Sequence, residues 1–351
     1  MKKRIASILV SIIAAAVVFT GCGSISNETK TKFSDQYYDV FDTAVSVTVY
    51  CSDRKIFDSV NGTIHEMLQI YHQLFDIYNE YDGVVNIKTL NDKAAQGPVE
   101  VSADITEFLS FAADMCRKTD GCMNIAMGAV LSLWHEAREK SLDDPSSAYI
   151  PSEAELKEAA QHCSIDDLVI DTQKNTVFFA DPLLKIDAGA VAKGWAVEKT
   201  AQLLESRWDE LKQHGVRGII ISAGGNVRIA GNKPGGTWTV AIQDPDSPDG
   251  SAYIAVIEDA SGSIVTSGAY QRYFEYNGKK YHHIIDKDSL MPEGRFLSVS
   301  IQTADSGYAD ALSTVLFNMD LEAGKAFAES LEGVEVLWVL PDRTLVKTAG
   351  W

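Results

Sequence analysis

Basic residues are scarce in this sequence. Its 351 residues include 31 Lys and Arg against 49 Asp and Glu, which gives a formal net charge of −18 at pH 7. Nucleic-acid-binding proteins obtain much of their affinity by neutralising phosphates with Lys and Arg, so we predict no nucleic-acid partner. An anionic ligand would therefore need a local positive group, such as a metal ion, a helix N-terminus or one well-placed lysine.

Cysteine is also rare, with 5 in the whole chain. One of them, Cys22, belongs to an unusual N-terminal segment, and the others are Cys51, Cys116, Cys122 and Cys163. So few cysteines do not make a disulfide scaffold, and a chain of this length can bury a core without covalent staples. We therefore predict free, buried thiols.

The N-terminus carries an apolar run with a basic start. The letters MKKR are followed by an almost purely apolar stretch over residues 5–19. This pattern is typical of a secretory signal peptide, and the run is short for a membrane-spanning helix. The sequence therefore predicts export of the mature protein.

The end of this run, Thr20-Gly21-Cys22, resembles a bacterial lipobox. The resemblance implies a signal peptide over residues 1–21, a lipid on Cys22 and an extracytoplasmic protein anchored to the cell membrane. A plain signal peptide with a chance cysteine is the alternative. Residues 22–36 are polar and lack periodicity, so we predict a flexible tether, with the folded domain over residues 37–351.

Helical spacing dominates the first half of the mature chain, and β-type alternation dominates the second. This order predicts an α+β fold. No linker rich in Pro, Gly or Ser divides the chain, so we expect one interwoven domain. Helices are expected at residues 56–78, 102–118, 126–140, 192–205, 309–318 and 321–331, and strands in AVSVTVYC, GIIIS, NVRIAG, TWTVAIQDP, AYIAVIED, SIVTSG, KKYHHIID, FLSVSIQT and EVLWVLP.

The stretch LLKIDAGAVAKGWAVEK could approach a phosphate. A strand ends at Asp187, a turn of small residues follows, and a helix begins near Val191. Such a turn brings backbone N–H groups close to an anion. Lys193 falls in the first helical turn, where a cation opposes the helix dipole. A bound phosphate would explain this lysine, whereas a solvated surface lysine is the alternative.

Two further segments contain candidate ligand-binding residues. Gly224 and Gly225 interrupt a strand in ISAGGNVRIAG, which indicates either a plain bulge or the close approach of a ligand. In DSGYADALSTVLF, Asp310 and Thr314 are spaced i and i+4 and share a helix face. A carboxylate with a hydroxyl suits a hard cation such as Mg²⁺. A helix cap with a buried threonine is the alternative.

The stretch YHHIIDKDSLMP places two histidines side by side in a chain that has only 7. A hairpin with two satisfied imidazoles is the simplest interpretation. Alternation along a strand would turn His282 and His283 to opposite faces. An imidazole titrates near neutral pH, so the one that faces a site could act as a general base.

Taken in order, these segments resemble the ApbE family of FAD:protein FMN transferases. The resemblance runs from about Tyr38 to Trp351. It rests on FDTAVSV, NIKTLN, TDGCMNIAMGAVLSLW, IDAGAVAKGWA, SAGGN, WTVAIQDP, TSGAYQRYF, HHIID and ADALST. The fold that it implies is a single α+β domain of the ApbE type, T-fold-like, with FAD in a cleft between two lobes.

The activity that the resemblance implies is Mg²⁺-dependent transfer of the FMN half of FAD. FMN would pass to a Thr or Ser hydroxyl of an extracytoplasmic target protein, forming a phosphoester and releasing AMP. FAD is then the substrate and Mg²⁺ the cofactor. The implied partner is an acceptor flavoprotein subunit with an S/D-G-A-T/S-like motif. No clear copy of that motif occurs in this chain, so modification of itself is not indicated.

The resemblance also assigns roles to residues. The implied walls of the flavin and adenine pockets are Phe41, Cys122, Met123 and Asn124. The implied contacts of the bound ligand are Asp187, Lys193 and Ile284. Mg²⁺ would be held by the Ala190 carbonyl and the side chains of Asp310 and Thr314. His283 would be the catalytic base, with Asp286 orienting its ring.

The sequence departs from the family pattern at three places. Residues 286–290 read DKDSL where D-P-x-T-G is common, Asn124 replaces a frequent Asp, and Val85 replaces a frequent Ser. Two other functions stay open: a pyrophosphatase that splits FAD into FMN and AMP, and a secreted FAD-binding lipoprotein without catalysis. Release of AMP with and without an acceptor separates transferase from pyrophosphatase, and binding that persists in EDTA without turnover would indicate a binding protein.

Overall fold

The computed structural model describes residues 31–247 and 250–351. The predicted signal peptide over residues 1–21 and the predicted lipidation of Cys22 lie outside the described residues. Within them, no helix has the length and apolar character needed to cross a membrane. The four cysteines of the described part are all free thiols, two of them buried and two half-buried.

The predicted tether is wrong at its C-terminal end. Strand β1 spans Thr31–Tyr37 and pairs antiparallel with β2, so the ordered fold begins before residue 37. The strand lies at the sheet edge, where one face and one side remain in solvent. Only Phe33 and Tyr37 are partly covered, and the Phe33 ring lies 5.7 Å from Phe57. Phe33 and Tyr37 are four residues apart with polar residues between them, so the sequence does not show the alternation typical of a strand.

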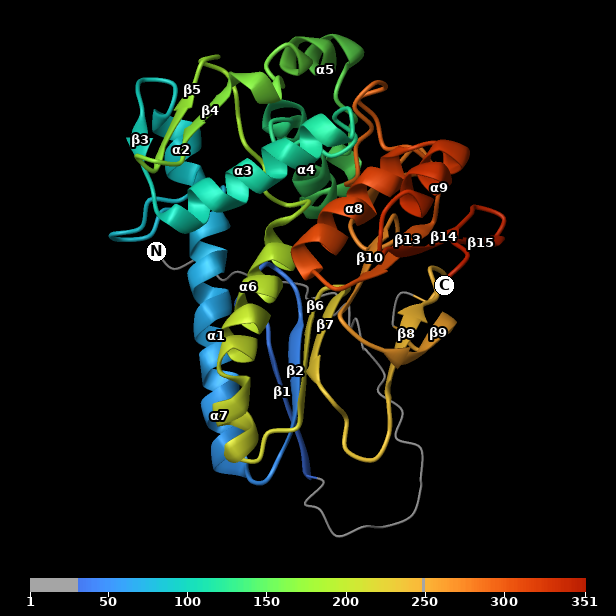
Figure 1. Ribbon diagram of the computed structural model, residues 1–351. Helices are drawn as coiled ribbons and strands as arrows, with labels where there is room; N and C mark the ends of the chain where they lie inside the picture. Colours follow the sequence, from blue (N-terminus) through green and yellow to red (C-terminus); the bar gives the residue numbers. More distant parts are fainter. Residues whose placement is uncertain (1–30, 248–249) are drawn as a thin grey trace.

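An antiparallel sheet forms the centre of the molecule (Figure 1). Its strand order is β1-β2-β6-β7-β10-β13-β14-β15. After β1, these strands span Val45–Cys51, Gly218–Ala223, Asn226–Gly231, Ser263–Gly268, Ser298–Thr303, Glu335–Val339 and Leu345–Lys347. The central strands are buried on both faces, which explains the unbroken apolar run GIIIS.

Three helices cover one face of this sheet: α1 (Arg54–Phe75), α6 (Ala192–Ser206) and α8 (Ser306–Asn318). A hairpin of β8 (Trp238–Gln243) and β9 (Tyr253–Ala260) covers the other face. Side chains alternate accordingly, with Ile219 and Ile221 facing the helices and Ile220 facing the hairpin. The main core therefore lies between the sheet and the helices that carry the predicted cation ligands.

The remaining elements gather at one end of the molecule, at the top of Figure 1. They include α2 (Ile87–Lys93), α3 (Ala103–Lys118), α4 (Gly128–Asp143), α5 (Glu153–Ala160) and a small sheet of β3 (Val99–Glu100), β4 (Leu168–Asp171) and β5 (Thr176–Phe179). The short helices α7 (Trp208–Gln213) and α9 (Leu321–Glu329) lie elsewhere on the main body. The α+β prediction is confirmed.

The hairpin of β11 (Tyr273–Tyr276) and β12 (Lys279–His282) carries the histidine pair. It packs on α4 through an aromatic cluster in which Trp134 lies 5.8 Å from Tyr281. The Trp134 Nε1 also donates a hydrogen bond to the carbonyl of Leu290. The hairpin, and with it the histidine pair, is therefore anchored to a helix from the first half of the chain.

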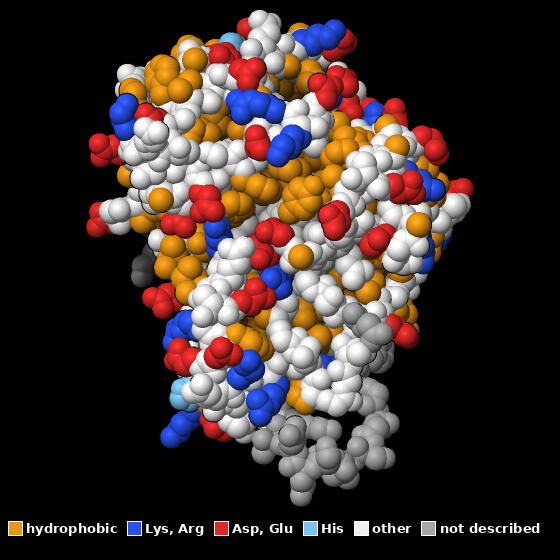
Figure 2. Space-filling view, in the orientation of Figure 1, with side chains coloured by type: hydrophobic (Ala, Val, Ile, Leu, Met, Phe, Trp, Pro, Cys, Tyr) orange, Lys and Arg blue, Asp and Glu red, His pale blue; other side chains and the backbone are white. Residues whose placement is uncertain are grey.

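Charged side chains of both signs are interspersed on the face of the molecule shown in Figure 2. On that face Lys and Arg occur singly or in small groups among Asp and Glu, without a continuous basic stripe. The absence of a nucleic-acid partner stays a prediction from composition.

Candidate functional site

One predicted cation ligand, Asp310, lies where α6 crosses α8. The backbone N–H of Gly194 donates a hydrogen bond of 2.7 Å to Oδ2 of Asp310. The two backbones approach so closely that a Cβ on Gly194 would lie closer than 3.0 Å to Asp310 Cβ and to the carbonyl of Ser306. A glycine at this point therefore lets one helix place its N–H groups against a carboxylate of the other.

This crossing frees a backbone carbonyl in the first turn of α6. In a regular helix the N–H of Gly194 would donate to the carbonyl of Ala190. Here it donates to Asp310 instead, and the described residues supply no other donor to the Ala190 oxygen. The predicted backbone ligand is therefore available to a cation.

Two side-chain oxygens beside this carbonyl are equally free. In the described residues, Oδ1 of the buried Asp310 has no hydrogen-bond donor, and Oδ2 has only Gly194. The hydroxyl of Thr314 makes no hydrogen bond to another described residue, unlike that of Thr200 on α6, which donates to its i−4 carbonyl at 2.7 Å. Ser313 next to it is already used, because its hydroxyl donates to the Asp310 carbonyl at 2.8 Å.

A carboxylate, a hydroxyl and a carbonyl form an oxygen donor set that suits Mg²⁺. Burial raises the pKa of Asp310, and the charge of Lys193 and the hydrogen bond from Gly194 oppose this rise. Across the described residues, no cluster of three or more His, Cys, Asp or Glu could hold a metal ion. A cation at the crossing would therefore be held jointly with oxygens from a ligand, as Mg²⁺ is in phosphate complexes.

The two histidines face different surroundings, but strand alternation is not the reason, because β12 ends at His282 and His283 lies just beyond it. His282 is buried, its Nε2 bonds the Glu293 carbonyl at 2.9 Å, and its Nδ1 accepts the N–H of Ile284 at 3.2 Å. His283 is exposed to solvent and makes one hydrogen bond, from Nδ1 to the carbonyl of Arg272 at 3.2 Å. Its Nε2 therefore has no hydrogen-bond partner among the described residues.

The expectation that Asp286 orients His283 is wrong. The Oδ1 of Asp286 accepts the backbone N–H groups of Asp288 and Ser289, and its Oδ2 pairs with Arg295 at 3.0 Å. The carboxylate thus closes a turn after the strand. The ring of His283 is oriented instead by the carbonyl of Arg272, which lies just before β11.

A family model described as "ApbE family" matches residues 41–338. The chain belongs to the ApbE family.

Full-length relatives of this family carry one name. A protein of Treponema pallidum named FAD:protein FMN transferase is 28% identical over 348 residues, which covers 95% of this chain and 91% of that protein. A protein of Escherichia coli K12 with the same name is 26% identical over 346 residues, covering 97% and 94%. The family resemblance predicted from the motifs is confirmed.

Solved structures share the fold. The ApbE protein of Thermotoga maritima superposes with a TM-score of 0.78 at 26% identity, covering 91% of this chain and 98% of that chain. The flavin transferase ApbE of Vibrio cholerae has a TM-score of 0.72 at 24% identity, covering 91% and 98%. The mixed α+β architecture is therefore that of crystallised ApbE proteins.

Several ionisable groups converge beside the α6 turn of this ApbE protein. Burial raises the pKa of Asp187. The nearby charges of His135, Arg272 and Lys193 oppose this rise. These groups come from α4, from the start of β11 and from α6. Arg272 and His283 are both exposed to solvent, although burial among surrounding protein atoms lowers the pKa of each. The surface around Asp187, Lys193, Arg272 and His283 is called the recess.

Arg272 and Tyr78 were not identified from the sequence. The Arg272 guanidinium donates to the carbonyls of Phe41 and Asp42, at 3.4 and 3.2 Å, and has no carboxylate partner among the described residues. Tyr78 packs against His135 with tilted rings whose centroids lie 5.0 Å apart. The signal for Arg272 lay within the quoted stretch TSGAYQRYF, whereas Tyr78 lies in a loop without a distinctive pattern.

The predicted pocket walls divide into two groups. Phe41 is half-buried beside the recess, and both Phe41 and Asp42 have positive φ, at 55° and 48°. The side chains of Met123 and Ile284 instead belong to the core, with Met123 only 1% exposed. These two could contact a ligand only through their backbone or their edges.

Asn124 and Cys122 have structural partners as well. The Asn124 side chain accepts the N–H of Ala126 and donates to the Cys163 carbonyl, both at 2.9 Å. The carbonyl of Cys122 accepts from Asn318 at 2.9 Å. The contacts of residues 122–124 with a ligand stay predictions.

The glycine pair forms a turn and not a bulge. Gly224 and Gly225 have φ of 54° and 91° and link β6 to β7 directly, as in a type I′ hairpin turn. Thr43 packs against Gly224 so closely that a Cβ there would clash with its hydroxyl. The turn therefore supports the Phe41–Thr43 segment at the edge of the recess.

A separate pocket lies between the sheet and the β8–β9 hairpin. Its lining includes Val240, Ile264, Thr266, Tyr270 and Gln271. It contains none of the predicted ligand or cation residues, and its only ionisable side chain is that of Tyr270. This pocket is therefore separate from the predicted ligand and cation residues.

We predict that Gly194→Ala will destabilise the protein by about 1–3 kcal/mol, because the added methyl group overpacks the α6–α8 crossing. Its Cβ would meet the backbone of Ser306 and the Cβ of Asp310. Gly62 offers a matched control, since it also lies in a helix, α1, but has no heavy atom within 4 Å of its Cβ position. Gly62→Ala should stabilise by about 0.5–1 kcal/mol. Urea denaturation measures both changes, and equal effects would contradict the described crossing.

Proposed function

We propose that this protein is a Mg²⁺-dependent FAD:protein FMN transferase. It transfers FMN from FAD to a Thr or Ser hydroxyl of an extracytoplasmic acceptor protein and releases AMP. Membership of the ApbE family and the shared name of the full-length relatives support the transferase class. The carrying observation is the set of three partner-free oxygens on Ala190, Asp310 and Thr314 at the α6–α8 crossing.

FAD lies in the recess between the main body and the α3–α5 end, which correspond to the two predicted lobes. The flavin contacts Phe41 and the segment of residues 122–124, and Asp187, Lys193 and Ile284 make the further contacts. Lys193 supports this placement, because its charge acts on Asp187, Asp310 and His283. A cation common to these three groups suits the pyrophosphate of the substrate.

The ligands of Mg²⁺ are the Ala190 carbonyl, Asp310 and Thr314. When bound, the ion supplies Lewis-acid stabilisation of the phosphate charge. Lys193 adds a second positive charge at the same phosphates. Mg²⁺ and Lys193 would thereby neutralise the two negative charges of the pyrophosphate, although the protein as a whole is acidic.

His283 takes the proton of the acceptor hydroxyl. A carbonyl only accepts hydrogen bonds, so the contact with Arg272 places the ring proton on Nδ1 and leaves Nε2 as the acceptor. The hydroxyl oxygen attacks the FMN phosphorus in line, and the bond from this phosphorus to the bridging oxygen breaks. The proton goes to Nε2, and AMP leaves with the bridging oxygen.

The pH dependence follows from the surroundings of His283. Burial, with the charges of Arg272 and Lys193 acting in the same direction, lowers the pKa of His283 to about 3. The ring of the free protein is therefore neutral, and ready to accept a proton, throughout the neutral and mildly acidic range. We predict that kcat/KM shows no acid-side inflection near the ordinary histidine pKa of about 6.5. A tenfold fall per pH unit below that value would contradict the assignment.

Counting AMP tests the function against its rivals. With FAD, Mg²⁺ and an acceptor bearing an S/D-G-A-T/S-like motif, we expect one AMP per acceptor modified and no release in EDTA. Equal AMP and free FMN without an acceptor would indicate the pyrophosphatase. FAD binding that persists in EDTA, with no AMP under any condition, would indicate a binding protein.

We also propose that the mature protein is anchored outside the cytoplasm by a lipid on Cys22, which would place the enzyme beside membrane-bound acceptors. Cys22→Ser should release the protein from the membrane fraction into the soluble extracytoplasmic fraction. Retention of the variant in the membrane would refute the anchor.

A further inference from the structure

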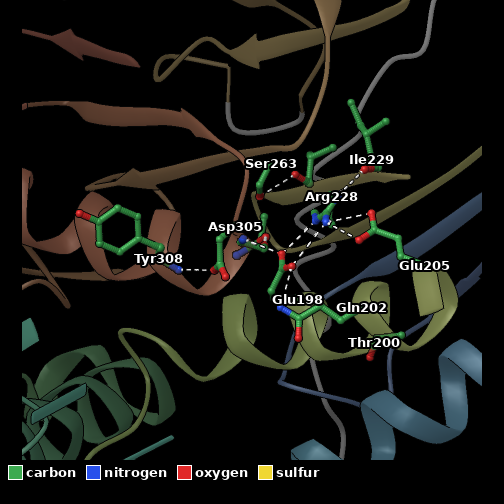
Figure 3. Close-up of polar contacts among 12 residues, drawn as sticks. Glu198, Thr200, Gln202, Glu205, Arg228, Ile229, Ser263, Asp305 and Tyr308 are labelled. Atoms are coloured by element: carbon green, nitrogen blue, oxygen red, sulfur yellow. Dashed lines mark hydrogen bonds and ion pairs between the residues drawn. The ribbon is translucent and has the colours of Figure 1, made fainter. Parts of the chain in front are cut away.

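A buried ion-pair network joins α6 to β7 near the start of α8 (Figure 3). At its centre is Glu198 of α6, which is 5% exposed. Its Oε2 accepts from Arg228 Nε of β7 at 2.9 Å and from the backbone N–H of Ser306, the first residue of α8, at 2.8 Å. Gln202 donates to Oε1 at 3.1 Å. One carboxylate thus joins two helices and the sheet.

The contact between Glu198 and Ser306 repeats the contact between Gly194 and Asp310 one helical turn away. Going from Gly194 to Glu198 advances four residues along α6, and going from Asp310 to Ser306 goes back four residues along α8. Residues four apart lie on the same helix face. Two hydrogen bonds therefore fix the sliding and the rotation of α8 against α6, where a single bond would leave rotation free.

Among the described residues, the start of α8 makes no other hydrogen bond to α6. Asp305 caps the helix by accepting the N–H of Tyr308 at 2.7 Å, but this bond is internal to the helix. The Ser306 hydroxyl donates to the side chain of Asn226 on β7. Glu198 places a full negative charge against the positive N-terminal end of α8, an arrangement that stabilises a helix end.

Arg228 holds Glu198 in place. It is 7% exposed, and its Nη2 also pairs with the half-exposed Glu205 at 3.0 Å. Buried ion pairs often add little net stability compared with apolar residues of the same size. Stability alone therefore does not explain the network. Its central carboxylate, Glu198, bonds α8 at Ser306, one turn before Asp310, and this position points to a positioning role.

We propose that Glu198, held by Arg228, is a positioning residue of the cation site. It fixes the register of α8 so that Asp310 and Thr314 face the freed carbonyl of Ala190. Neither Glu198 nor Arg228 touches the cation or the substrate. The inference rests on the proposed cation site and assigns its affinity to a network that lies outside the recess.

Cation affinity tests this role in the folded protein. Mn²⁺ serves as the probe, because its binding can be titrated by electron paramagnetic resonance in the presence of AMP and competed with Mg²⁺. Loss of groups that orient metal ligands typically weakens metal binding about 10–100-fold. We expect Glu198→Ala to raise the Mn²⁺ dissociation constant by about this factor. Excess Mg²⁺ should restore most of kcat, which separates a positioning role from a general loss of fold.

Two further variants keep the test decisive if Glu198→Ala fails to fold. Glu198→Gln retains size and an acceptor oxygen but loses the charge, and should weaken Mn²⁺ binding by a smaller factor. Glu205→Gln is the matched control, since Glu205 pairs with the same Arg228 but makes no bond to α8. Its Mn²⁺ affinity should stay within about twofold of the unchanged protein.

The outcomes separate this inference from the proposed function. Folded Glu198 variants with unchanged Mn²⁺ affinity, alongside an Asp310→Asn variant that loses binding, would refute the positioning role and leave the cation site intact. If Glu205→Gln weakened Mn²⁺ binding equally, the positioning role would also be refuted. The charge of the network, and not the contact of Glu198 with α8, would then determine the Mn²⁺ affinity. Absence of Mn²⁺ binding in the unchanged protein would overturn the site and the inference together.

Discussion

Replacing Asp310 with Asn is expected to lower the rate of FMN transfer by about a thousandfold. Asp310 supplies the only carboxylate among the three oxygens at the crossing of α6 and α8. Charge stabilisation by a bound metal ion is worth several kcal/mol in a transition state, and each 1.4 kcal/mol or so is a tenfold change in rate. Asn keeps the volume and an acceptor for the Gly194 N–H, so the helix crossing should persist.

The stability of this variant gives a second signature. Burial raises the pKa of Asp310, so the folded protein holds this proton more tightly than the unfolded chain. The carboxyl group therefore costs stability as pH rises above its ordinary value of 3.8. Without metal, Asp310→Asn should unfold at the same temperature as the unchanged protein or at a higher one.

Asp320→Asn is the control, because Asp320 lies just beyond the end of the same helix with its side chain in solvent. It should alter neither transfer nor melting temperature measurably. Full transfer by Asp310→Asn would exclude Asp310 as a cation ligand.

Replacing His283 with Ala is expected to lower the transfer rate by about 10²–10⁴-fold, the usual contribution of a general base. FAD binding should change little, since the ring makes its only hydrogen bond to the protein backbone. Single-turnover transfer with saturating FAD measures the chemical step. Added imidazole should restore part of the lost rate by entering the vacated space.

The control is His214→Ala. His214 is exposed at the C-terminal end of α7, which lies at the end of the molecule opposite α3–α5 (Figure 1), and should tolerate the change. A His283→Ala protein with an undiminished rate, or a loss that imidazole cannot restore at any concentration, would contradict the role of the ring as a base.

Several features of the site were predictable because they depend on local spacing. Asp310 and Thr314 share a helix face, as the i, i+4 spacing requires. His282 is buried and His283 is exposed, as expected, although β12 ends at His282 and His283 lies just beyond it. Lys193 lies in the first turn of α6, as the glycine-containing turn before it indicated. Each of these conclusions needs only the geometry of one element.

The remaining features depend on contacts between distant segments. Gly194 is essential through its approach to Asp310, 116 positions later in the chain, and nothing in the surrounding residues reveals that distance. Arg272 orients His283 through a neighbouring strand, so the nearby carboxylate of Asp286 was the wrong candidate. Strand β1 was missed because an edge strand buries too few side chains to show alternation.

The intact mass of an acceptor protein after incubation with FAD and the soluble enzyme tests the central claim most directly. The account predicts that the acceptor gains one FMN less one water in the presence of Mg²⁺. It predicts no gain in EDTA and almost none with the Asp310→Asn enzyme. An acceptor that gains FMN equally well in EDTA, or one that stays unmodified while free FMN and AMP accumulate, would contradict it.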